Sequence, residues 1–137
     1  MPQMTDQAFA RAFEAGDVLP AQFGHRAHLR VAWVYLREAP SVAAAVDHMR
    51  SAIRRFAAAA DASRKYHETL TVLWMRLLAD VRSQGASGEL ADVLHAYPDL
   101  ADKDLPLRFY TRERLFGDEA RAGWVEPDRC LLGVIAS

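Results

Sequence analysis

HRAHLRVAWVYLREA, residues 25–39, has the spacing of an amphipathic helix. At about 100° per residue, its apolar side chains gather on one arc, whereas Arg26, Arg30 and Arg37 take the opposite face. His25 and His28 lie on the apolar arc, three residues apart. A buried polar group without a partner costs about 1–3 kcal/mol. Two inward-facing imidazoles therefore indicate a site.

Helical spacing continues on both sides of this stretch, and no segment alternates like a strand. The pattern predicts an all-α fold, with one domain over residues 1–137 in a helical bundle of four to six helices. A non-helical C-terminal tail follows Trp124. The other predicted helices run from Thr5 or Asp6 to Gly16, from Ser41 into the Ala57–Ala60 run, from about 64 to 84 and from about 88 to 97, with shorter pieces near Leu107–Tyr110 and Asp118–Trp124.

Composition narrows the classes of function. The chain has 137 residues, 51% hydrophobic, with a net charge of −1 and no basic run, so we expect no nucleic-acid and no membrane partner. No apolar stretch reaches the ~18 residues of a membrane span, so a cytoplasmic location is expected. The single cysteine, Cys130, excludes an intrachain disulfide. The apolar tail Cys130–Ala136 could cover the bundle or make a homo-oligomer.

A third inward histidine, His67, lies on the apolar arc of the helix predicted over residues 64–84. Side chains at i and i+3 lie about 5–6 Å apart at Cβ, close enough for His25 and His28 to share one ion. Helical bundles build such sites from facing helices. The pattern thus predicts a transition-metal site of His25, His28 and His67, holding zinc, copper or iron for redox or hydrolytic chemistry.

Other interpretations of these residues stay open. His67 and Tyr66 could act as acid and base in a metal-free site that binds a small-molecule ligand. The histidines could instead be satisfied core residues, in an interaction protein that associates with itself. Whether the protein is an enzyme is undecided. Between Arg108 and Arg129, arginines alternate with carboxylates, which favours pairing between them.

Three segments resemble a family of small uncharacterised bacterial proteins: FGHRAHLRVAWVYL (23–36), KYHETLTVLW (65–74) and ARAGWVEPD (120–128). Members carry the elements F-x-H-x-x-H-L, Y-H-x-T and A-R-x-x-W-x-x-P-D. The resemblance covers Phe23 to Asp128 and implies no particular reaction. Besides the three histidines, it marks four residues as candidates for a catalytic role: Tyr66, Thr69, Arg121 and Asp128.

Overall fold

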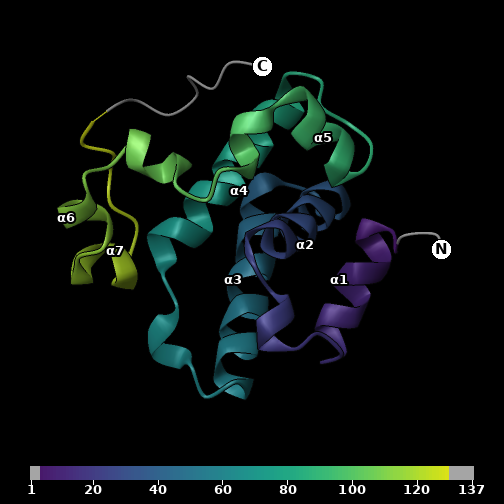
Figure 1. Ribbon diagram of the computed structural model, residues 1–137, viewed down its shortest axis with the longest axis horizontal. Coiled ribbons are helices and arrows are strands. Elements are labelled where there is room, and N and C mark those ends of the chain that lie inside the picture. The colour runs from purple at the N-terminus through teal and green to yellow at the C-terminus, as the bar shows by residue number, and fades with distance from the viewer. Residues whose placement is uncertain (1–3, 130–137) are drawn as a thin grey trace.

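Helix α2 (His25–Glu38) is the central element of the fold (Figure 1). Every residue from Val31 to Leu36 is buried, which is a wider face than one amphipathic arc. The reason is that four helices contact it: α1 (Asp6–Glu14), α3 (Val42–Ala59), α4 (Glu68–Ser83) and α5 (Leu90–Ala96). Apolar side chains from these elements form one buried cluster around α2.

The computed structural model describes residues 4–129. Within this range the chain forms seven α-helices and no strand, so the predicted all-α fold is confirmed there. Helices α6 (Arg112–Leu115) and α7 (Asp118–Ala122) complete the set. Four short 3-10 helices connect the longer elements: η1 (Pro20–Gln22), η2 (Ser63–Lys65), η3 (Pro98–Ala101) and η4 (Leu105–Arg108).

The starts of the helices follow local capping chemistry. Thr5 Oγ1 accepts a hydrogen bond from the Ala8 N–H (3.1 Å), and Ser41 Oγ accepts one from Ala44 (3.1 Å). Each cap of this kind stabilises a helix by about 1 kcal/mol. These two starts agree with the predicted boundaries.

Other boundaries differ from the prediction. Helix α4 begins at Glu68 rather than at about residue 64, because η2 and two extended residues precede it. The piece expected near Leu107–Tyr110 is the 3-10 helix η4, and α6 was not predicted. Helix α7 ends at Ala122, two residues before the predicted end at Trp124. Residues 125–129 are non-helical, as expected, whereas the tail Cys130–Ala136 lies outside the described residues.

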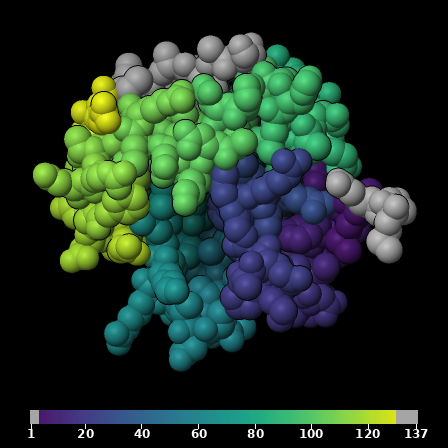
Figure 2. All heavy atoms as spheres, viewed as in Figure 1, coloured from purple at the N-terminus to yellow at the C-terminus, as the bar shows by residue number. Residues whose placement is uncertain are grey.

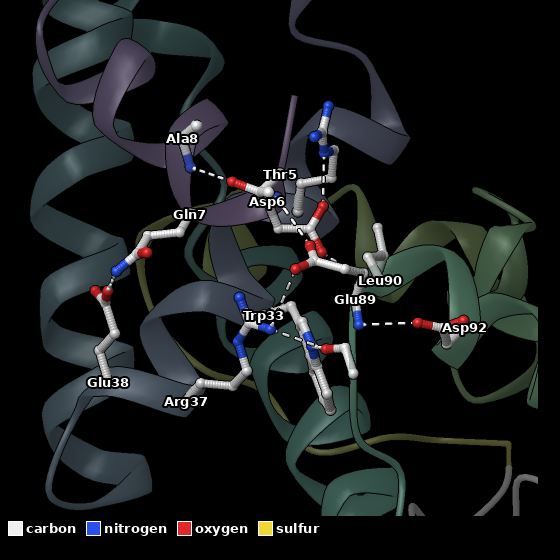
Figure 3. A network of polar contacts seen from close by, with 12 residues as sticks. Thr5, Asp6, Gln7, Ala8, Trp33, Arg37, Glu38, Glu89, Leu90 and Asp92 are labelled. Atoms are coloured by element: carbon white, nitrogen blue, oxygen red, sulfur yellow. Dashed lines mark hydrogen bonds and ion pairs between the residues drawn. The ribbon is translucent and has the colours of Figure 1, made fainter. Parts of the chain in front are cut away.

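A polar network joins α2 to the segment that leads into α5 (Figure 3). Trp33 Nε1 and Arg37 Nη1 each donate a hydrogen bond to the backbone oxygen of Gly88, both at 2.9 Å. The α1 end of this network is the buried carboxylate of Asp6, to which Arg30 Nε donates at 2.8 Å. Charged groups therefore fix how α1 and α5 pack on the central helix. Among residues 4–129, no helix is long and apolar enough to cross a membrane.

Candidate functional site

His25 and His28 open helix α2 as predicted, but they have different surroundings. His25 Nε2 donates a hydrogen bond to the backbone oxygen of Leu100 (2.9 Å), and its ring packs on Trp74 with 4.5 Å between ring centroids. His28 is partly buried and meets Phe23 edge-on at 6.1 Å. Burial, together with the nearby His25, lowers the pKa of His28 to about 4. His28 is therefore neutral at pH 7.

His67 is the N-cap of α4 rather than a residue within it. Its Nδ1 accepts a hydrogen bond from the Leu70 N–H (3.1 Å), and its Nε2 donates to the backbone oxygen of Leu115 (2.6 Å). The partners therefore define one neutral tautomer and occupy both ring nitrogens. Burial keeps the pKa of His67 below its ordinary value, which preserves that tautomer.

The predicted three-histidine metal site is wrong. Within the described part of the chain, no group of three or more His, Cys, Asp or Glu side chains could hold a metal ion. Helical periodicity does not apply to His67, because its backbone is extended (φ −134°, ψ 105°). The ring consequently turns toward α6 and offers no free lone pair. The same two hydrogen bonds engage both ring nitrogens of His67, so this side chain would have to break one of them to act as an acid or base. The metal-free alternative with His67 and Tyr66 stays a prediction.

Tyr66, beside His67, belongs to a different polar cluster. Its hydroxyl donates a hydrogen bond to Glu68 Oε1 (2.5 Å). The Glu68 carboxylate is also bound by Arg50, with Nε at 2.9 Å and Nη2 at 2.6 Å from Oε2. Although burial opposes it, this pairing holds the pKa of Glu68 below its ordinary value. The cluster ties α3 to the start of α4 and fixes the Tyr66 ring.

A groove of about 550 Å³ opens beside that ring. Helix α3 forms one side and α7 the other, while η2 and Tyr66 lie between them. In Figure 2, the yellow-green atoms of α6 and α7 lie beside the teal atoms that include residues 54–66. Eight residues line the groove: Arg54, Ala57, Ala58, Ser63, Tyr66, Asp118, Arg121 and Ala122.

Two arginines give the groove its positive charge. The Arg54 guanidinium lies over the Tyr66 ring, 4.8 Å from its centroid. Arg121 comes from the opposite side, on α7. Among residues 4–129, neither guanidinium lies within 4.0 Å of a carboxylate. For Arg121 this differs from the pairing that the sequence favours.

Thr69 and Asp128 lie outside this groove and hold the last described segment in place. Thr69 Oγ1 donates to the backbone oxygen of Gly123 (2.8 Å) and accepts from the Val125 N–H (3.2 Å). The Asp128 carboxylate accepts from the backbone N–H (2.8 Å) and the hydroxyl (2.7 Å) of Thr111. The structure thus brings Tyr66 and Arg121 together and places the other two candidates elsewhere. The catalytic role marked for all four stays a prediction.

Sequence reasoning missed three residues at or below the groove. Arg50 and Arg54 have the i, i+4 spacing of one helix face, a signal that is visible in the sequence. On a helix that starts at about residue 64, Glu68 points away from His67, so the predicted boundary gives no reason to place it at a site. With α4 beginning at Glu68, this residue lies in the first turn, where a carboxylate is favourable.

No protein-family model, no curated protein and no solved structure matches this chain. The resemblance to small bacterial proteins therefore stays a prediction.

Proposed function

We propose that this protein binds a small organic anion, bearing a carboxylate or phosphate group, in the groove between α3 and α7. The observation that carries the proposal is the placement of Arg54 and Arg121. They come from opposite sides of one groove and have no carboxylate partner among the described residues. Guanidinium groups bind planar carboxylates and phosphates through paired N–H donors.

The size and walls of the groove support this proposal. Its volume of about 550 Å³ falls within the roughly 300–1,000 Å³ of small-molecule sites. Ala57, Ala58 and Ala122 provide apolar walls, and Ser63 adds a hydroxyl. Tyr66 is held in place by Glu68, so part of the groove is formed before any ligand binds. Such preorganisation reduces the entropy cost of binding.

Calorimetric titration with inorganic phosphate and with 3-phenylpropionate tests the proposal. A hydrogen bond to a charged group contributes about 1.5–3 kcal/mol, and 1.4 kcal/mol corresponds to tenfold in Kd. We therefore expect Arg54→Gln and Arg121→Gln each to weaken binding about tenfold. Raising the salt concentration should weaken binding to the wild-type protein, because exposed charges are screened.

Matched control variants are available on α3 itself and on α6, the helix that precedes α7. Arg55→Gln, on α3, and Arg112→Gln, on α6, each remove an exposed arginine that does not line the groove. These controls should bind as the wild-type protein does. Equal losses in the controls and the groove variants would mean that only the overall charge matters, and the proposal would then be wrong.

A further inference from the structure

Asp118 introduces a negative charge into a groove that is otherwise positive. It lines the groove together with Arg54 and Arg121, and it is exposed. Among residues 4–129, no Lys, Arg or His nitrogen lies within 4.0 Å of its carboxylate. For a ligand that carries only negative charge, Asp118 reduces the attraction.

The separation of Asp118 from Arg121 is informative because the two residues are three positions apart on one helix. Side chains at that spacing are neighbours and commonly pair. Two other pairs with this spacing do so here: Arg11 with Glu14, at 3.1 Å, and Asp47 with Arg50, at 2.6 Å. Asp118 and Arg121 instead both line the groove without an ion pair between them. The groove therefore offers separate positive and negative groups to one ligand.

We infer that the ligand is amphoteric: an anionic group pairs with Arg54 and Arg121, and a cationic ammonium group of the same molecule pairs with Asp118. This inference rests on the proposed function and specifies the substrate class of the same groove. Amino-acid-like molecules have this chemistry. Their side chain would pack on the apolar walls made by Ala57, Ala58 and Ala122.

Three compounds with the same phenylethyl body separate the charges. Phenylalanine carries both groups, 3-phenylpropionate only the anion, and phenethylamine only the cation. We expect phenylalanine to bind the wild-type protein at least fivefold more tightly than either of the others. Asp118→Asn should weaken phenylalanine binding about fivefold and leave 3-phenylpropionate binding unchanged or tighter. Asp118 is exposed, so this variant should keep the fold.

Glu119→Gln is the control for acidic groups on α7 outside the groove. Glu119 borders a second, acidic hollow with Glu113, Asp118 and Asp128, and it does not line the arginine groove. The Glu119→Gln variant should bind phenylalanine as tightly as the wild-type protein does. An equal loss in Glu119→Gln would place the ammonium in the acidic hollow and overturn the inference.

The remaining outcomes separate the inference from the proposed function. Phenylalanine binding that is no tighter than 3-phenylpropionate binding, or that is unchanged in Asp118→Asn, would overturn the inference and leave anion binding intact. If neither phosphate nor any of the three compounds binds the wild-type protein, both are overturned.

Discussion

Asp6 and Glu89 cap each other's helices across the molecule. The Asp6 N–H, at the start of α1, donates to Glu89 Oε2 (2.9 Å), and the Leu90 N–H, at the start of α5, donates to Asp6 Oδ2. Figure 3 shows the two carboxylates side by side between these helices. Arg30 supplies the compensating positive charge. Residues distant in sequence thus satisfy backbone donors that would otherwise lack partners.

We predict that Asp6→Asn lowers the free energy of unfolding by about 2–3 kcal/mol, because Asp6 is buried and its charge pairs with Arg30. Burial raises the pKa of Asp6, but hydrogen bonds from Leu90 and Arg30 outweigh it and hold the pKa below the ordinary 3.8. The stabilisation is therefore present above pH 4 and is lost as the pH falls through the folded-state pKa. Urea unfolding at pH 7 and pH 3 should show less acid destabilisation in the variant. An unchanged pH dependence would contradict this role.

Glu68→Gln should destabilise the protein by about 2 kcal/mol, because it leaves Arg50 without its buried partner. Asp47→Asn is the matched control. Asp47 binds the same guanidinium, but its side chain is 75% exposed, so its removal should cost at most about 0.5 kcal/mol. Thermal unfolding of both variants measures the difference. Equal losses would show that burial of the Arg50–Glu68 pair contributes nothing.

His28 should make stability depend on pH between about 7 and 5. Its folded-state pKa of about 4 lies below the ordinary 6.5, so the unfolded chain takes up a proton first as the pH falls. The free energy of unfolding therefore falls by about 1–2 kcal/mol between pH 7 and pH 5. In urea unfolding, the free energy of unfolding of His28→Gln should fall less over this interval. His67, whose pKa is also lowered, still contributes to the fall in the same direction. A full-sized loss in the variant would assign the effect to other groups.

The sequence predicts the helices better than the site, and α2 and His67 show why. The apolar arc of residues 25–39 and the Ser41 cap are local signals, and they locate α2 and the start of α3. The position of His67 depends on whether the chain is already helical at residue 67. The 3-10 turn at Ser63–Lys65 decides that, and its effect on a side chain is not visible in periodicity.

The groove could not be predicted for a related reason. Arg54 and Arg121 line one groove only because α7 packs against α4 and η2 packs against α3. No spacing rule connects two residues so far apart in sequence. The resemblance did mark Tyr66 and Arg121, but it gave no sign that Thr69 and Asp128 would lie elsewhere.

Thr69→Val should loosen the segment that follows α7. Thr69 is fully buried, and its hydroxyl donates to the Gly123 oxygen and accepts from the Val125 N–H. An isosteric apolar replacement therefore leaves this oxygen and this N–H without their partner. We expect a loss of about 1–3 kcal/mol and faster amide hydrogen exchange at Val125. Thr71→Val is the comparison, because the Thr71 hydroxyl bonds within its own helix to the His67 oxygen. Unchanged exchange at Val125 in Thr69→Val would contradict the anchoring role.

Chemical-shift mapping tests anion binding in the groove most directly. Titration of the ¹⁵N-labelled protein with 3-phenylpropionate should shift backbone amides between Arg54 and Tyr66 and between Asp118 and Ala122. Arg54→Gln combined with Arg121→Gln should abolish those shifts at the same ligand concentration. Shifts that cluster elsewhere, or that persist unchanged in the double variant, would contradict the account.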